Sequence, residues 1–197
     1  ATYDVKYILE ARNLMKIVEE KFISEGAYHE TASDGENLIV RQISGYDGVE
    51  PSGNSNAALA FLKLGAYSGE YSSIKCAEKI FLAFHEELVE FGMNSSYMMQ
   101  ALHLYLGGLK EVAIIGKRND SATKEMLKVI RSGFFPNAVF AFSYEDEIVK
   151  HSATLPLLAG KTLKNSTVTA YVCKLGTCLP PVNSPEDLVN LLKYEEN

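Results

Sequence analysis

The sequence of 197 residues is 47% apolar and 22% charged, with a formal net charge of −6 and a pI near 5.3. These values are typical of a globular protein with one large or two small domains, and they exclude a disordered chain. The acidic balance argues against nucleic-acid binding, which usually requires a basic face. With no apolar run near the ~20 residues of a membrane helix and no leading signal segment, we expect a cytoplasmic protein without a membrane partner.

The first half of the chain has the period of helices. Residues 4–24 carry apolar side chains at helical intervals, and residues 52–67, 70–91 and 95–106 form three more such stretches. Between the first two, Gly26 is expected to stop the helix, Asp34-Gly35 signals a turn, and LIVRQI (38–43) has the composition of a strand. The pattern predicts a short hairpin followed by helical hairpins.

The second half changes character from about residue 110. EVAIIG (111–116) is a continuous apolar strand of the buried kind, and a helix capped by Asp120 or Ser121 follows it. NAVFAFS, STVTAYVC and TCLPPV are further strand candidates, and SPEDLVNLLKY (184–194) is a helix with Ser184 as N-cap and Pro185 next. The fold class predicted is therefore mainly α with a small α/β part, divided into helical hairpins (1–108) and an α/β segment (109–197).

The stretch DGVEPSGNS (47–55) allows two interpretations of its acidic pair. Asp47 and Glu50 fit a general acid and base, as in glycoside chemistry, where two carboxylates flank the bond that is cleaved. They also fit a helix start, because acids are favoured near the positive end of a helix and Ser52 or Asn54 can cap it. The residues alone favour the helix start.

Cys173 and Cys178 stand on either side of a KLGT turn, where cross-strand cysteines can reach disulfide geometry. The spacing is not the C-x-x-C of thiol oxidoreductases, and no second pair of ligands predicts zinc or another metal. We expect two reduced, half-buried thiols, with a reversible disulfide as the alternative. Cys76 lies in a helical stripe and is expected in the core.

Two segments carry a family resemblance over nearly the whole chain from about residue 7: LIVRQISGYDGVEPSGNSNAALAFLKL, and STVTAYVCKLGTCLPPVNSPEDLVNLL with its A-Y-V-C…C-x-P-P-V pattern. The sequence resembles the thioredoxin-containing family that includes spermatogenesis-associated protein 20. The resemblance implies an N-terminal thioredoxin-like domain, absent here, and an α/α-toroid of the six-hairpin glycosidase type, related to N-acylglucosamine 2-epimerases. The chain is then expected to be the C-terminal portion, with partial toroid hairpins followed by a short sheet with packed helices.

In such toroids the hairpin and the loop before the next inner helix face a central pocket, so the resemblance implies that Asp47 and Glu50 lie at one end of it. The leading functional hypothesis makes this acidic pair the catalytic residues. Substrate-binding side chains would come from Tyr28, His29, Arg41 and Asn54. Arg41 would pair with either acid and lower its pKa.

The leading functional hypothesis is the C-terminal part of a carbohydrate-active-like protein with a small sugar ligand, unknown substrate and no cofactor. The alternative is a non-enzymatic structural or interaction module that partners a thioredoxin-like domain, and whether the chain is an enzyme stays open. A third hypothesis makes Cys173 and Cys178 a redox-sensitive pair. A cut toroid exposes helix faces, so pairing with the missing N-terminal part, or with a second copy when the chain is alone, is expected.

Overall fold

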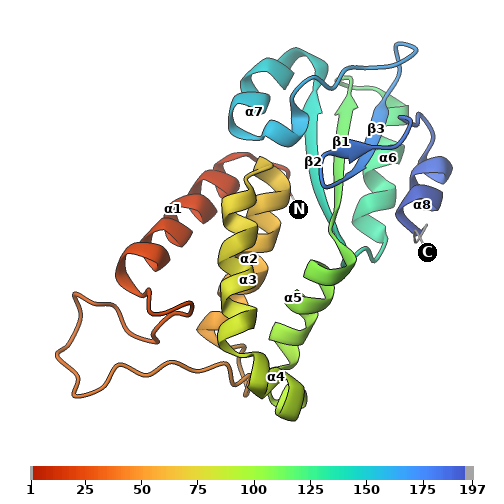
Figure 1. The fold of residues 1–197 in the computed structure, drawn as a ribbon. Coiled ribbons are helices and arrows are strands. Elements are labelled where there is room, and N and C mark those ends of the chain that lie inside the picture. The colour runs from red at the N-terminus through yellow and green to blue at the C-terminus, as the bar shows by residue number, and fades with distance from the viewer. Residues whose placement is uncertain (1, 194–197) are drawn as a thin grey trace. The chain divides into compact units, whose positions relative to one another are not determined.

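The computed structural model describes residues 2–193, and the chain divides into two compact units (Figure 1). One unit contains residues 6–65 and 70–107, and is helical. The other contains residues 1–5, 66–69 and 108–197, and holds a four-stranded sheet. The prediction of a mainly α protein with a small α/β part is confirmed.

The helical unit contains α1 (Lys6–Lys21), α2 (Gly53–Ser68), α3 (Tyr71–Ala83), α4 (His85–Phe91), the 3₁₀ turn η1 (Gly92–Ser95) and α5 (Ser96–Gly107); the last residues of α2 belong to the other unit. The four predicted helical stretches are confirmed, but one continuous helix over 70–91 is wrong. It breaks at Phe84, whose φ of −108° and ψ of 15° leave the helical region. The core of this unit is made of fully or nearly fully buried side chains from α2, α3 and α5: Ala58, Phe61, Leu62, Ala77, Ile80, Met98 and Ala101.

The segment 22–52 is where the sequence prediction fails. LIVRQI forms no strand: the Glu30 N–H donates to the Gln42 carbonyl at 2.9 Å, but the β-bridge described in this segment is an isolated one between Ile23 and Tyr28. The side chains of Ile39 and Val40 are 104% and 76% exposed. A β-branched run needs a neighbouring strand to bury it, and here the chain supplies none. Gly26, with φ +87°, serves the turn between Ile23 and Tyr28 and does not end α1, which stops at Lys21.

The second unit is built on a sheet of order β2-β1-β3-β4, formed by β1 (Lys110–Gly116), β2 (Ala138–Tyr144), β3 (Thr169–Lys174) and β4 (Thr177–Cys178). β1 runs parallel to β2 and antiparallel to β3, and β3 is antiparallel to β4. The helices are α6 (Ser121–Ser132), α7 (Ile148–Thr154) and α8 (Pro185–Lys193), with 3₁₀ turns η2 (Glu145–Glu147) and η3 (Pro156–Leu158). The four predicted strands are confirmed, whereas α7 was not predicted.

The two faces of this sheet have different neighbours. Because side chains alternate along a strand, Val112 and Ile114 share one face. They pack there with α6 and α8 in a core that includes Met126, Leu127, Ile130, Leu188 and Leu192. The register pairs Glu111 with Cys173, which places both on the opposite face.

Both predicted caps of the second unit are present. The Asp120 carboxylate accepts a hydrogen bond from the Thr123 backbone N–H at the start of α6. Ser184 Oγ accepts one from the Asp187 N–H at 3.1 Å at the start of α8, and Pro185 is the first helical residue. Tyr194, the predicted last residue of that helix, lies outside the described residues.

Replacing Ser184 with Ala should lower the free energy of unfolding by about 1 kcal/mol, because the first turn of α8 loses the acceptor for one N–H group. Ser184→Thr keeps the hydroxyl and should retain most of the stability. Urea unfolding followed by circular dichroism measures both. Equal losses for the two variants would contradict the capping role.

Candidate functional site

Asp47 ties the irregular segment to two helices. Its Oδ1 accepts a hydrogen bond from the Ser52 N–H at 2.8 Å, just before α2. Its Oδ2 accepts from the N–H groups of Tyr97 and Met98, at 2.7 and 3.1 Å, in the first turn of α5. A carboxylate is favoured at the start of a helix because free N–H groups and the helix dipole are both positive there. Asp47 therefore caps a helix 50 residues further along the chain.

Glu50 does not share this position. Its side chain is exposed, while the Asp47 oxygens face backbone donors of α2 and α5. The helix-start interpretation of DGVEPSGNS accounts for Asp47, although the helix that the carboxylate caps most fully is α5 and not the adjacent α2. Ser52 adds a local cap, since its Oγ accepts the Ser55 N–H at 3.0 Å.

Asn54 and Tyr28 form a buried junction. The Asn54 side chain, which is 1% exposed, accepts from the Tyr28 N–H at 2.8 Å and donates to the Tyr28 and Ser44 carbonyls at 2.9 Å each. The Tyr28 ring stacks on Phe61 of α2, with centroids 5.9 Å apart. These three hydrogen bonds of the Asn54 side chain are all made to backbone groups of the segment 22–52.

Arg41 and His29 serve the same segment. The Arg41 guanidinium donates to the carbonyl of Lys21 at 3.0 Å and to that of Thr31, and His29 Nδ1 lies 3.0 Å from the Arg41 carbonyl oxygen. The prediction that Arg41 pairs with Asp47 or Glu50 is wrong. The guanidinium donates instead to the carbonyls of Lys21 and Thr31. The structure thus brings the predicted residues, Glu50 apart, into one network that holds the backbone.

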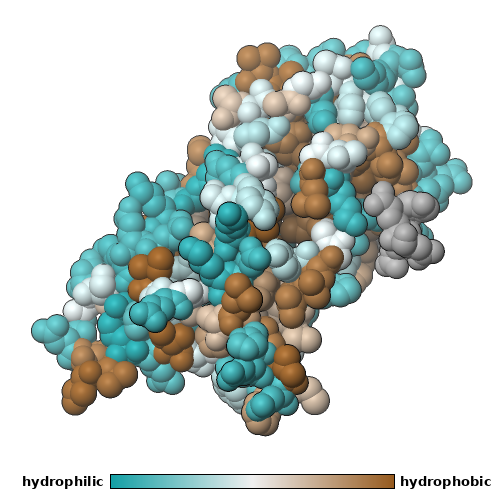
Figure 2. Space-filling model, viewed as in Figure 1, coloured by the Kyte–Doolittle hydropathy of each residue, from teal (hydrophilic) through white to brown (hydrophobic). Residues whose placement is uncertain are grey.

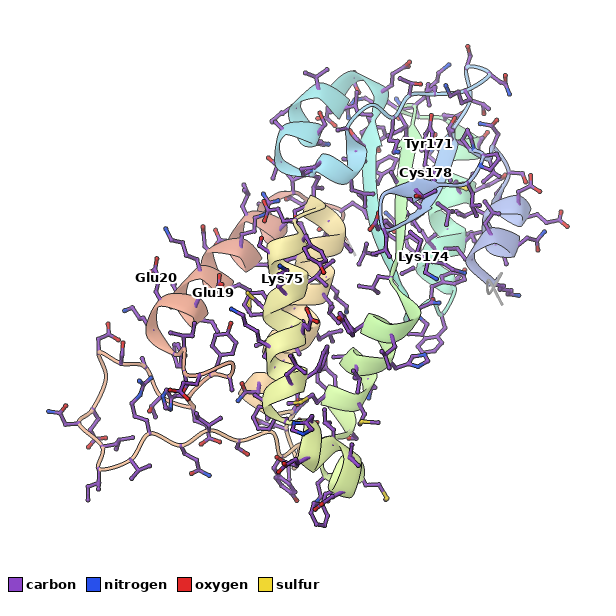
Figure 3. The ribbon with its side chains drawn as sticks, in the orientation of Figure 1. Glu19, Glu20, Lys75, Tyr171, Lys174 and Cys178 are labelled. Atoms are coloured by element: carbon purple, nitrogen blue, oxygen red, sulfur yellow. A yellow bond between two sulfur atoms is a disulfide. The ribbon has the colours of Figure 1, made fainter. Side chains whose placement is uncertain are left out.

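Cys76 of α3 lies beside α1 and Tyr28. Its Sγ donates to Glu19 Oε1 at 3.4 Å, and Figure 3 shows Glu19 on the side of α1 that faces α3. Burial and the hydrogen bond to Glu19 raise the pKa of the Cys76 thiol. The pKa of Tyr28 is also raised, mainly by burial and to a smaller extent by the neighbouring Cys76. Cys76 is half-buried, and its raised pKa keeps it a thiol and a weak nucleophile.

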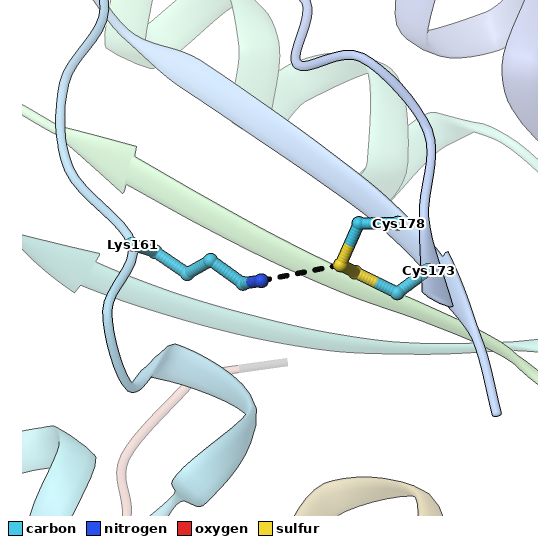
Figure 4. Close-up of a disulfide and its surroundings, with 3 residues drawn as sticks. All are labelled: Lys161, Cys173 and Cys178. Carbon is cyan, nitrogen blue, oxygen red and sulfur yellow. Dashed lines mark hydrogen bonds between the residues drawn. A yellow bond between two sulfur atoms is a disulfide. The ribbon is translucent and has the colours of Figure 1, made fainter. Parts of the chain in front are cut away.

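The second candidate site lies on the face of the sheet opposite α6 and α8. Against the expectation of two reduced thiols, Cys173 and Cys178 are joined in a disulfide, with their Cα atoms 3.9 Å apart as a directly opposed pair of β3 and β4. The Lys161 Nζ lies 3.2 Å from Cys178 Sγ (Figure 4). The same ammonium sits 5.1 Å from the centre of the Tyr171 ring.

Glu111 completes this group of side chains. Burial raises the pKa of Glu111. Hydrogen bonds from the Gly176 and Leu175 backbone N–H groups and the charge of Lys161 lower the pKa and partly offset this effect. The sequence pointed to the two cysteines but not to Lys161 or Glu111. No local pattern marks either one, because β1 and the segment after η3 meet the cysteines only in the folded sheet.

Ser143 and His151 form a further pair that the sequence analysis missed. Ser143 Oγ is 3.0 Å from His151 Nδ1, near the carboxyl end of β2, and donates to the Tyr144 carbonyl at 2.9 Å. Carboxyl ends of parallel strands are common ligand sites. Ser143 is fully buried, however, so its hydroxyl is not presented to a substrate.

Over residues 2–193 there is no group of three or more His, Cys, Asp and Glu side chains that could hold a metal ion. No helix in the same range combines the length and apolar character needed to cross a membrane.

Comparison with known proteins gives relatives that are much longer than this chain. The chain is similar to spermatogenesis-associated protein 20 of Homo sapiens, with 29% identity over 167 residues, which are 85% of this chain and 21% of that protein. The same protein of Rattus norvegicus is 28% identical over the same shares. An uncharacterised protein of Caenorhabditis elegans is 24% identical over 187 residues, 94% of this chain and 25% of its own length. No family model matches the chain.

The expected resemblance to spermatogenesis-associated protein 20 is therefore confirmed as sequence similarity over most of the chain. The chain spans about a fifth of the length of these mammalian relatives. The toroid and the thioredoxin-like domain stay predictions.

Asp47→Ala should lower the free energy of unfolding by about 2 kcal/mol, because three backbone N–H groups lose their acceptor. Glu50→Gln, at an exposed position three residues away, should change it by less than about 0.5 kcal/mol. Urea unfolding of both variants measures the difference. A stable Asp47→Ala protein would show that the carboxylate does not hold α5.

Asn54→Ala should cost about 2–3 kcal/mol, since a buried amide that makes three hydrogen bonds is removed and the Tyr28 N–H is left unpaired. Asn56 is the matched control. It lies two residues after Asn54, is exposed, and its side chain donates to the carbonyls of Pro51 and Ser52. Asn56→Ala should stay within about 0.5 kcal/mol of the parent. Thermal unfolding compares the two, and equal losses would refute the junction's importance.

Proposed function

We propose that this chain is a non-enzymatic interaction module, which packs against a further helical part of a longer protein. The observation that carries the proposal is the state of α1. None of its residues is buried, and it exposes large apolar side chains: Tyr7, Leu9, Leu14 and Ile17. A helix in a globular unit normally buries its apolar stripe, so α1 has apolar surface left to cover.

The apolar side chains of α1 form two sets. Ile8, Met15 and Val18 are half-buried and face the rest of the helical unit, at the spacing the sequence predicts. Leu14 and Ile17, 61% and 43% exposed, belong to the other set and point away. Part of the apolar surface of α1 is therefore left exposed.

The segment 22–52 adds to this surface. Leu38, Ile39, Val40, Ile43, Tyr46 and Val49 are all exposed on backbone that the Asp47, Asn54 and Arg41 network holds in place. Figure 2 shows hydrophobic side chains among hydrophilic ones over α1 and this segment. Single exposed apolar residues are ordinary, but gathered ones on fixed backbone mark interaction surfaces.

The length of the relatives supports the choice of partner. Proteins similar to this chain are about four times as long, so in such proteins further chain is available to pack against this surface. We take a helical segment of such a longer protein as the occupant because α1, as an amphipathic helix, packs readily along another helix.

The carbohydrate-active alternative is less well supported by the geometry. Asp47 gives both carboxylate oxygens to backbone N–H groups, and Asn54 and Arg41 give their donors to carbonyls. Glu50 is the one member of the expected acidic pair that is exposed. A sugar site would have to rest on Glu50, since the other side chains are committed to the fold.

When expressed alone, the chain should self-associate, because the same apolar surface then finds a second copy. Light scattering across a concentration series should give a mass that rises above the 21.7 kDa of the monomer. The double variant Ile39→Ser/Val40→Ser removes exposed apolar side chains and should shift association to about tenfold higher concentration without lowering unfolding stability. A parent chain that stays monomeric throughout would contradict the proposal.

A thermal-shift series with a panel of sugars tests the alternative on the same samples. The interaction module predicts no stabilisation by any sugar. Stabilisation by one sugar that Glu50→Gln abolishes would replace the proposal with the carbohydrate-active function.

A further inference from the structure

We propose that Cys173 and Cys178 form a thiol–disulfide exchange site, which reacts with a dithiol and is tuned by Lys161. The site lies in the unit that holds the sheet, and goes beyond the interaction surface proposed for the helical unit. Three observations carry it: the unequal exposure of the two cysteine residues, the ammonium beside one of the sulfurs, and the backbone hydrogen bonds that hold the chain after β4 without the disulfide.

The two cysteines are directly opposed but differently placed. Cys173, on β3 and next to the central strand β1, is 3% exposed. Cys178 stands on β4, the edge strand, and is exposed. An incoming thiolate therefore reaches the Cys178 sulfur and not that of Cys173. Exchange in which one sulfur is attacked and the other is shielded has a defined order of steps.

Lys161 stands at the accessible sulfur. Its Nζ is 3.2 Å from Cys178 Sγ (Figure 4). The same ammonium lies 5.1 Å from the centre of the Tyr171 ring. A positive charge next to a cysteine favours the thiolate over the thiol. The ammonium thus stabilises the reduced form of the pair and attracts an anionic thiolate. It also makes Cys178 a better leaving group and raises the fraction of Cys178 that is present as thiolate.

The exchange is balanced as follows. A thiolate of the dithiol attacks Cys178 Sγ, and a bond forms between these two sulfurs. The Cys173–Cys178 bond breaks with its electron pair on Cys173 Sγ, which takes the proton that the second thiol of the dithiol gives up. The second thiolate of the dithiol then attacks its own partner sulfur in the mixed disulfide. The electron pair of that bond leaves on Cys178 Sγ as a thiolate beside Lys161. The dithiol is oxidised by two electrons and the cysteine pair is reduced by two.

A dithiol suits this geometry better than a single thiol. In the mixed disulfide Cys173 remains opposite Cys178 in the β3–β4 pair, so it re-forms the original bond rapidly. A second thiol in the same attacking molecule competes with this reclosure because its effective concentration is also high. We therefore infer that the natural reductant presents two thiols.

The chain around the pair is also held by backbone hydrogen bonds that do not depend on the disulfide. The Leu179 N–H donates to the Val172 carbonyl at 2.9 Å, and Ala170 and Val182 exchange two backbone bonds of 2.9 and 3.0 Å. These bonds keep the chain after β4 on β3. The loop that the disulfide closes is also short, with a sequence separation of 5, so its entropic stabilisation is at the low end.

The experiment is a redox titration of the native chain in dithiothreitol buffers, quenched with acid and alkylated, with the bond state read by mass spectrometry. Lys161→Met should lower the equilibrium constant for reduction about tenfold, which is about 30 mV for this two-electron couple. Lys161→Arg, which keeps the charge, should stay within about threefold of the parent. Lys164→Met removes an exposed charge three residues away and should stay within twofold.

Two results would overturn the proposal. One is a disulfide that excess dithiothreitol opens only after denaturant is added, as a buried structural bond would behave. The other is a Lys161→Met protein whose equilibrium constant matches that of Lys164→Met.

Cys76 provides an internal reference for the reduced chain. In a brief pulse of iodoacetamide followed by peptide mapping, Cys178 should be labelled at least tenfold faster than Cys76, whose pKa is raised by burial and by its bond to Glu19. Faster labelling of Cys76, or of Cys173, would show that Cys178 is not the activated thiol.

Discussion

The helical unit depends on how the backbone of the segment 22–52 is satisfied. A long stretch without helix or ladder leaves N–H and C=O groups that must find other partners if they are not in water. Asn54, Arg41 and Asp47 supply them, through bonds to the Tyr28 and Ser44 backbone, to the Lys21 and Thr31 carbonyls, and to the first turn of α5. These polar residues fix the course of the segment as a strand partner would have done.

This constraint explains why residues that suggest a catalytic site act structurally. Carboxylate, amide and guanidinium groups are chosen for the same property in both roles, which is strong, directed hydrogen bonding. From sequence, DGVEPSGNS shows that such groups are present near a helix start, and it shows no more. Whether they face a substrate or a backbone depends on α5, which lies about 50 residues away in the chain.

The features that sequence could predict are local ones. The period of α1, the buried run of β1 and the caps at Asp120 and Ser184 each follow from a few adjacent residues, and each is present. LIVRQI has a strand composition, but a strand also needs a neighbour, and composition cannot supply that. Lys161 and Glu111 were beyond prediction for the same reason: the sheet register brings Glu111 to Cys173, and the folded segment after η3 brings Lys161 to Cys178.

The two units therefore divide polar chemistry differently. In the helical unit, polar side chains such as Asn54 make hydrogen bonds to the backbone, and exposed apolar side chains provide a surface suited to packing. In the unit with the sheet, the central strands are satisfied by their own ladder, and the Lys161 ammonium lies against a sulfur instead of a backbone carbonyl. A regular sheet holds Cys173 and Cys178 in place without using their chemistry, and for this reason the reactive group of this protein is expected on the sheet and not in the acidic stretch before α2.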